Sequence, residues 1–457
     1  MYSIHTFLLQ KELFRSPEPV KTTVVSSFTD TPALQQIARQ ADSDYILFYT
    51  GTSPIELHPY AIGRMYQIAE SNDGALFYSD YQEIRQGKKI HHPTLEYQTG
   101  SIRNDFDFGQ LLLFRNDSFQ QVVAQMNTDY RFAALYELRL SISRLGKIVH
   151  IPETLYTVQP TDLRLSGEKQ FDYVDPANRE VQLEMEAVCT AHLQAIGAWL
   201  APEFQRIDFG QENFAREASV IIPVRNRKRT IAEAVESALQ QQTDFSFNVI
   251  VVDNHSTDST GQILTELSRR YPNLIHHIPA STELGIGGCW TEAILLPECG
   301  KFAIQLDSDD LYKDCHVLQR IVDTFYQENC AMVIGSYQMV DFKLEEIPPG
   351  LIAHREWTPD NGRNNALRIN GLGAPRAFYT PVLRQIKFPN VSYGEDYATA
   401  LAISRKYPIA RIYDPLYLCR RWEENSDHDL DIQQLNSYNF YKDKIRTLEI
   451  QARISGK

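Results

Sequence analysis

The chain has 457 residues, which favours two domains, and its 43% hydrophobic and 23% charged residues are typical of a globular protein. A formal net charge of −13 disfavours binding to nucleic acid or to anionic lipid surfaces. The six cysteines form no C-x-x-C pair, and the chain shows neither a signal-peptide run nor a stretch of roughly 18–20 apolar residues, so we expect a cytoplasmic protein with no transmembrane segment.

The first half of the chain repeats the second half in diverged form. Residues 44–53 parallel 301–310, residues 74–82 parallel 330–338, and residues 143–156 parallel 404–417. In the first of these pairs, Thr50-Gly51-Thr52-Ser53 stands where the second half has Asp307-Ser308-Asp309-Asp310, so no carboxylate is left. We therefore predict a shortened, degenerate and non-catalytic α/β copy of the second half over residues 1–165.

A helical connector is predicted over residues 166–215. Within it, apolar residues recur at near-helical spacing between Asn178 and Leu200, namely Leu183, Val188, Leu193, Ile196 and Leu200. Such a helix is expected to pack as a strut between the two domains.

A regular strand–helix alternation begins at Ala218. Apolar runs at 219–223, 247–252, 274–278 and 302–306 predict buried strands, and residues 230–240 and 259–271 predict helices between them. Continuous apolar strands alternating with helices predict a parallel, doubly wound α/β sheet, in which ligands bind beyond the carboxyl ends of the strands. Residues 216–457 are therefore the predicted catalytic domain.

Two acidic clusters follow strands of this sheet. The first, Asp307 to Asp310, offers hard oxygen ligands for Mg²⁺ or Mn²⁺, although a solvated helix N-terminus has the same composition. The second, Asp253 to Asp258, offers acceptors for a base or a ribose, and equally a capping turn for the next helix. A third acidic group, the pair Glu395-Asp396, opens a helix. One of its carboxylates is suited to act as a general base, although such a pair is also a favourable charge at a helix start.

Four ordered segments together resemble family-2 glycosyltransferases of the GT-A fold: Ala218–Val224, Val251–Asp258, Phe302–Tyr312 and Gly394–Asp396. The resemblance implies a metal-dependent enzyme of the hexosyl or N-acetylhexosaminyl type, using Mn²⁺ or Mg²⁺. It implies inverting transfer of a sugar from a nucleotide-diphosphate donor, with a UDP-sugar as first expectation. A glycan or glycolipid acceptor hydroxyl in cell-surface polysaccharide assembly follows by analogy alone, and peripheral membrane association through a partner stays open.

The same resemblance assigns roles to individual residues. Asp396 is the expected catalytic base, Glu395 contacts the acceptor, and Asp309 with Asp307 binds the metal. The expected nucleotide contacts are Pro223, Val224, Asn226, Asp253, Asn254, Asp307 and Ser308. In place of the family's closing Arg-x-His pattern, Arg421 as a nucleotide contact or His428 as a metal ligand is expected to close over the diphosphate.

Two more residues are predicted at the acceptor from their own chemistry. Gly373 lies in a glycine-containing stretch that lets the backbone approach a sugar, and an ordinary turn is the competing interpretation. Trp422 offers a ring face for a sugar, although aromatic residues more often lie in a core.

The chain departs from the family pattern at two places. Asn254 replaces a second Asp, and Trp290 lies in the stretch where family members carry an Arg that contacts phosphate, so Arg225, Arg227 or Lys228 would have to supply the charge. Two alternative functions stay open. A nucleotidyltransferase-like enzyme would need a glycine-rich loop, and residues 224–227 contain no glycine, whereas a non-catalytic carbohydrate-binding protein fits only the first half.

Overall fold

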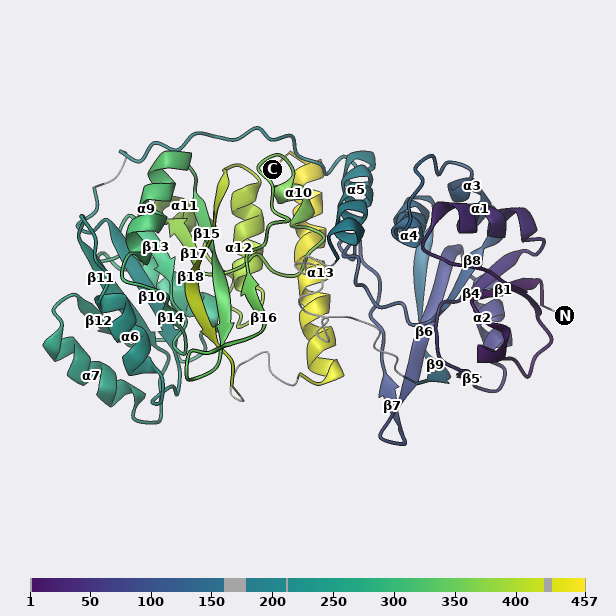
Figure 1. Cartoon of the computed structure of the whole chain (residues 1–457), viewed down its shortest axis with the longest axis horizontal. Helices are drawn as coiled ribbons and strands as arrows, with labels where there is room; N and C mark the ends of the chain where they lie inside the picture. Colours follow the sequence, from purple (N-terminus) through teal and green to yellow (C-terminus); the bar gives the residue numbers. More distant parts are fainter. Residues whose placement is uncertain (1, 160–177, 211–212, 423–429, 457) are drawn as a thin grey trace. The chain divides into compact units, whose positions relative to one another are not determined.

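The computed structural model describes residues 2–159, 178–210, 213–422 and 430–456 (Figure 1). The chain divides into two compact units, unit 1 over residues 1–199 and 430–457 and unit 2 over residues 200–429. No described helix is both long and apolar enough to cross a membrane.

Unit 2 contains the motifs of the predicted catalytic domain. Its elements in chain order are β10 (Ala218–Val224), α6 (Ile231–Leu239), β11 (Phe247–Asp253), α7 (Thr260–Arg270), β12 (Leu274–His277), α8 (Ile286–Leu295), β13 (Phe302–Gln305), β14 (Leu311–Tyr312), α9 (Val317–Glu328), β15 (Met332–Val340), β16 (Glu346–Ile352), α10 (Gly362–Asn365), β17 (Arg376–Tyr379), α11 (Thr380–Ile386), α12 (Glu395–Ser404) and β18 (Ile409–Arg420).

These strands form one sheet in the order β12-β11-β10-β13-β17-β15-β18-β14, with β16 paired to β15. The four strands predicted from apolar runs, β10 to β13, pair in parallel as expected, because helices cover both of their faces. Beyond these four strands the sheet is mixed, since β17 runs antiparallel between β13 and β15. A run of four residues carries no signal of its direction, which pairing alone decides.

Unit 1 contains a second sheet. Its elements are β1 (Ile4–Leu8), β2 (Phe14–Arg15), β3 (Lys21–Val24), α1 (Thr31–Gln40), β4 (Tyr45–Tyr49), β5 (Ile55–Leu57), α2 (Ala61–Glu70), β6 (Gly74–Arg85), β7 (Lys88–His92), β8 (Leu111–Arg115), α3 (Asn116–Val123), α4 (Ala134–Leu145), β9 (Lys147–Val158), α5 (Arg179–Ala195) and α13 (Ile432–Ile454).

The strand order in unit 1 is β2-β5-β9-β6-β8-β4-β1-β3, with β7 paired to β6. Strand β8 runs antiparallel between β4 and β6, and β9 pairs in parallel with β6, in the same way as β17, β15 and β18 pair in unit 2. A tyrosine in each unit also makes the same bond, from Tyr136 to the Ile102 carbonyl and from Tyr397 to the Ala366 carbonyl. The origin of unit 1 as a degenerate copy stays a prediction.

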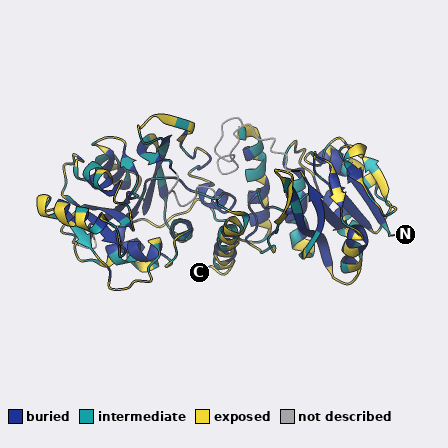
Figure 2. Ribbon diagram, turned by 90° about the horizontal axis from the view of Figure 1, so that it is seen from below, coloured by how far each residue is buried: buried dark blue, intermediate teal, exposed yellow. Residues whose placement is uncertain are grey.

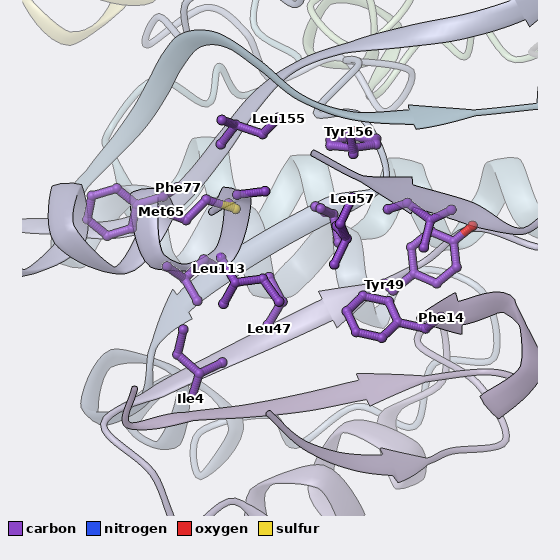
Figure 3. Packing of buried hydrophobic residues seen from close by; sticks show 14 of the residues in the cluster. Ile4, Phe14, Leu47, Tyr49, Leu57, Met65, Phe77, Leu113, Leu155 and Tyr156 are labelled. Atoms are coloured by element: carbon purple, nitrogen blue, oxygen red, sulfur yellow. The ribbon is translucent and has the colours of Figure 1, made fainter. Parts of the chain in front are cut away.

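The core of unit 1 lies between its sheet and α2. Leu47, Leu113, Phe77 and Met65 pack there side by side, with Tyr49 and Phe14 at the other end of the cluster (Figure 3). In both units the central strands are buried, and exposed residues lie on β3, β7, β16, the outer helix faces and the turns (Figure 2). Unit 1 therefore has a hydrophobic core of its own.

The end of the chain packs with unit 1 rather than with the predicted catalytic domain over 216–457. Asp443 on α13 is 1% exposed and accepts hydrogen bonds from Ser101 and Arg103 of unit 1. The Gly100 amide donates to Thr447. The buried Asp443 carboxylate pairs with two cations, Arg446 of its own helix at 2.8 Å and Arg103, far away in the sequence, at 3.2 Å.

The connector predicted over 166–215 is divided between the two units. Helix α5 belongs to unit 1, where Val188 and Leu193 are buried as predicted, whereas Leu183 is 48% exposed. From Leu200 onward the chain lies against unit 2, where Asn364 bonds both backbone groups of Leu200. Residues 160–177 and 211–212 lie outside the described residues.

Candidate functional site

Three polar loops meet at the carboxyl ends of β10, β11 and β13. Asn226, in the loop after β10, accepts from the Thr257 amide at 2.7 Å and donates its own amide to Ser256 at 2.9 Å. Thr230 donates its hydroxyl to the Ser308 carbonyl at 2.9 Å, which joins the first loop to the third. The edge of the sheet expected to bind ligand is therefore a set of mutually bonded loops, in which Asn226 holds two loops together.

Asp253 ends β11 and is 2% exposed. Burial acts to raise the pKa of Asp253, but hydrogen bonds from His276 and Ser256 outweigh burial and lower it, so the carboxylate is ionised at neutral pH. A hollow of about 780 Å³ opens beside it, lined among others by His255, Asp258, Gly261, Arg269 and His276. This hollow places an ionised acceptor where a base with an N–H group can reach it.

Asn254 follows directly and is 7% exposed. Its side-chain amide nitrogen donates to the Leu284 carbonyl at 2.8 Å, and its backbone amide donates to the Val224 carbonyl at 2.8 Å. Its Oδ1 is buried and meets no donor among the described residues. The Asp-to-Asn change therefore leaves a neutral acceptor beside the charged one.

The cluster after β13 splits into groups with different surroundings. Asp307 accepts twice from the Gln305 amide, at 2.9 and 3.0 Å, and its own backbone amide donates to the Tyr417 hydroxyl. Asp310 is 5% exposed and accepts from the Arg420 amide at 2.8 Å. Burial, reinforced by the neighbouring carboxylates, raises the pKa of Asp307 and raises that of Asp310 well above its usual value.

Asp309 has different neighbours from Asp307 and Asp310. Its Oδ2 accepts from the Trp422 indole at 3.1 Å and lies 3.9 Å from the Arg227 Nε. Arg227 thereby brings positive charge to the site, as expected of one of the three cations near residues 225–228. Trp422 is 8% exposed, and Arg227, Arg229 and Phe342 pack on its ring beside Asp309, so its acceptor role stays a prediction.

A line of hydrogen bonds connects the acidic cluster after β13 to the predicted base. Gln305 donates to Asp307 and accepts from the backbone amide and the Nε of Arg376, at 3.1 and 3.0 Å. The Nη1 of Arg376 donates to the Asp396 carboxylate. Asp307 and Asp396, 89 positions apart in the sequence, are thus separated by only two side chains.

Glu395 and Asp396 stand beside each other at the start of α12 but differ electrostatically. Asp396 is ion-paired with Arg376, whereas one carboxyl oxygen of Glu395 is buried with no hydrogen-bond partner among the described residues. Burial, and then the charge of Asp396, raises the pKa of Glu395 to about 8. Near neutral pH, Glu395 is therefore mainly protonated and able to donate a hydrogen bond.

Replacement of Glu395 by glutamine is expected to stabilise the chain increasingly as pH rises. The folded-state pKa near 8 exceeds the unfolded value of about 4.3, so the folded state holds a proton that the unfolded state has lost. The stability that this proton supplies is complete below the unfolded pKa and is lost as pH rises through about 8. Thermal melts from pH 4 to 9 in a chelator should show a growing difference between Glu395→Gln and wild type. A constant difference would contradict the raised pKa.

The other predicted residues have mixed outcomes. Pro223 and Val224 end β10 beside the site, and the Arg421 amide donates to the Val340 carbonyl at 2.9 Å. Gly373 has a φ of +101°, and a Cβ there would lie 2.9 Å from His354; its acceptor role stays a prediction. His428 lies outside the described residues. Trp290 is buried against Phe388 and Phe378, which explains why no cation stands there.

Four site residues were missed from the sequence: Gln305, Arg376, Arg420 and His276. Gln305 had a usable signal, because it lies two positions before Asp307 and side chains alternate along a strand. Arg376 and Arg420 had none, since antiparallel pairing of β13 with β17 and of β14 with β18 brings them to the site. Arg420 is 1% exposed and bonds the Asp309 carbonyl and Glu233.

The carboxylates fit a divalent cation that is shared with phosphate. Among the described residues no group of three His, Cys, Asp or Glu side chains could enclose a metal. Mg²⁺-type sites that also bind a diphosphate commonly use only one or two protein carboxylates and complete their shell with phosphate oxygens and water. Asp307 and Asp309 supply such a pair. Their negative charges repel each other, and a bound cation would relieve this repulsion.

Comparison with known proteins shows where the similarity lies. Residues 219–386 match the family model described as Glycosyl transferase family 2. The chain is 25% identical over 230 residues to poly(ribitol-phosphate) beta-glucosyltransferase of Bacillus spizizenii, an alignment that covers 49% of this chain and only 35% of that relative. The matched family segment includes Asp253, Asp307 and Asp309 and ends before Glu395.

Solved structures also resemble this chain. S. aureus TarS 1-349 in complex with UDP-GlcNAc has 23% identity and a TM-score of 0.40, over 52% of this chain and 72% of that one. Glucosyl-3-phosphoglycerate synthase from Mycobacterium tuberculosis, in complex with Mn²⁺, UDP and glucosyl-3-phosphoglycerate, has 16% identity and a TM-score of 0.34, over 53% of this chain and 81% of that one.

Proposed function

Since residues 219–386 form a glycosyl transferase family 2 segment, we propose that the chain transfers a sugar from a UDP-sugar to an acceptor hydroxyl, with inversion at the anomeric carbon. The supporting observation is the hydrogen-bonded line from Asp307 through Gln305 and Arg376 to Asp396. This line connects two carboxylates of one site, and we assign Asp307 to the donor and Asp396 to the acceptor. The acceptor is proposed to be a glycan or glycolipid of a cell-surface polymer.

Each part of the site has a task in this reaction. Asp253 and Asn254 accept hydrogen bonds from the base and ribose, and Arg227 adds positive charge near the diphosphate. Asp309 and Asp307 would hold Mn²⁺ or Mg²⁺, which supplies charge neutralisation for the leaving nucleoside diphosphate. Asp396 takes the proton of the acceptor hydroxyl as that oxygen attacks, and Glu395 in its protonated form donates a hydrogen bond to another acceptor hydroxyl.

Unit 1 is proposed to lack this chemistry. If Tyr136 and Tyr397 are aligned through their matching bonds, the positions of Glu395 and Asp396 are occupied by Ala134 and Leu135. Thr50 and Thr52 stand where Asp307 and Asp309 do. With no carboxylate at either place, the copy could neither take a proton nor hold a cation.

The proposal is tested by incubating the full chain with UDP-glucose, UDP-GlcNAc and GDP-mannose, with Mn²⁺ or with chelator, and measuring nucleotide release. We expect release of UDP from at least one UDP-sugar, only with the metal, and none from the GDP donor. Formation of a UDP-sugar and pyrophosphate from UTP and a sugar phosphate would favour the nucleotidyltransferase alternative. Absence of both UDP binding and release would favour a non-catalytic carbohydrate-binding protein.

A further inference from the structure

We propose that Arg376, held in place by Gln305, is a positioning residue that keeps Asp396 ionised and aimed and couples it to the donor-side carboxylate Asp307. This inference rests on the proposed function in taking Asp396 as the base. It goes beyond that function by naming what decides which of the two adjacent carboxyl groups at α12 carries the charge.

The first part of the argument is geometric. Arg376 begins β17, which pairs antiparallel with β13, so its side chain and Gln305 lie on neighbouring strands. Gln305 Oε1 receives both the backbone amide and the Nε of Arg376, at 3.1 and 3.0 Å. Two bonds from one residue to one oxygen leave the guanidinium little freedom of rotation. Its Nη1 edge then faces the Asp396 carboxylate.

The second part concerns charge. Arg376 forms an ion pair with Asp396. Glu395, its neighbour, has a buried carboxyl oxygen without a partner. Two adjacent carboxyl groups in one partly buried site do not ionise equally, and the one that pairs with a cation takes the charge. Arg376 therefore selects Asp396, rather than Glu395, to receive the proton.

The third part concerns coupling between the two ends of the site. The Gln305 amide cannot rotate without losing bonds on both sides, because its nitrogen serves Asp307 and its oxygen serves Arg376. The position of Asp307 is therefore transmitted to Asp396 through two rigid, planar groups. Neither group needs to touch the donor or the acceptor to fix the distance between the donor-side and acceptor-side carboxylates.

The test uses Arg376→Met and Gln305→Met in the full chain, with Arg384→Lys as control. Arg384 is a half-buried arginine of α11 that donates to the Ile294 carbonyl and takes no part in the site. We expect kcat to fall about 10- to 100-fold in Arg376→Met, the size expected for a hydrogen bond to a charged group, and less in Gln305→Met. The donor KM should stay within about twofold, as expected when an interaction acts in the transition state only. The acid limb of the kcat profile should move to higher pH, and Arg384→Lys should match wild type.

A purely structural role for Arg376 would not move the pH profile. In Arg376→Ala we expect free guanidinium to restore part of kcat, and a purely structural role would give no such recovery. An unchanged kcat and pH profile in Arg376→Met overturns the proposal, and if that variant does not fold, Gln305→Met decides in the same way. Carboxyl ¹³C titration of Asp396 in wild type and in Arg376→Met gives an answer without turnover. An upward-shifted midpoint in the variant supports the role of Arg376 even if no UDP-sugar is a donor, and an unshifted one refutes it.

Discussion

Replacing Asp396 by asparagine is expected to lower the kcat of sugar transfer by about 10²–10⁴-fold, the usual contribution of a general base. Asparagine keeps the shape and can still accept from Arg376, but it cannot take the acceptor proton. Nucleotide binding should be unchanged, because the substitution keeps the size of the side chain and leaves Asp253 and Asp309 in place. Steady-state transfer and calorimetric titration with UDP and Mn²⁺ measure the two effects separately.

The matched control is Asp323→Asn, since Asp323 is an exposed carboxylate on α9 that accepts a hydrogen bond from Gln319 of the same helix. It should leave both transfer and UDP binding at wild-type values. If Asp396→Asn retained full kcat, the proton would have to go elsewhere. Glu395→Gln would then be the variant to examine next.

Asp309→Ala is expected to abolish the stimulation of UDP binding by Mn²⁺ and to weaken metal-dependent binding by more than about 100-fold. The reason is that charge neutralisation by a bound cation contributes several kcal/mol, and each 1.4 kcal/mol changes an equilibrium constant tenfold. Transfer should fall with it. Calorimetric titration with UDP, with and without Mn²⁺, measures the difference.

Two controls separate the charge of Asp309 from its packing. Trp422→Phe removes the indole donor to Asp309 but keeps the ring, and it should lower UDP affinity only slightly. Asp314→Ala removes an exposed carboxylate paired with Arg320 and should have no effect. Equal Mn²⁺ stimulation in Asp309→Ala and wild type would rule out Asp309 as the metal ligand.

The elements near the site were largely predictable from the sequence because their signals are local. Four apolar runs predicted β10 to β13 within one or two residues, and Thr230 and Gly394 preceded the helices α6 and α12. The acidic residues at the strand ends were visible for the same reason. In a parallel sheet, the residues that follow the strands face one common edge, so their convergence needs no further information.

Other features depended on partners far away in the sequence. The sequence predicts the last 28 residues as the end of the catalytic domain. In the structure they belong to unit 1, where Asp443 pairs with Arg103. The sequence predicts that the Trp422 ring stacks on a sugar. In the structure Arg227 and Arg229 lie over this ring, and its indole donates to Asp309. No window of sequence contains either pairing.

By itself, the sequence determined the strands, the helices that follow them and the kinds of side chain at the strand ends, because periodicity and local chemistry act over a few residues. The tertiary structure alone decided which of two neighbouring carboxyl groups is charged and how the two ends of the site are connected. Both depend on Arg376, whose antiparallel strand lies 71 positions from Gln305, and electrostatic effects follow distance in space rather than distance along the chain.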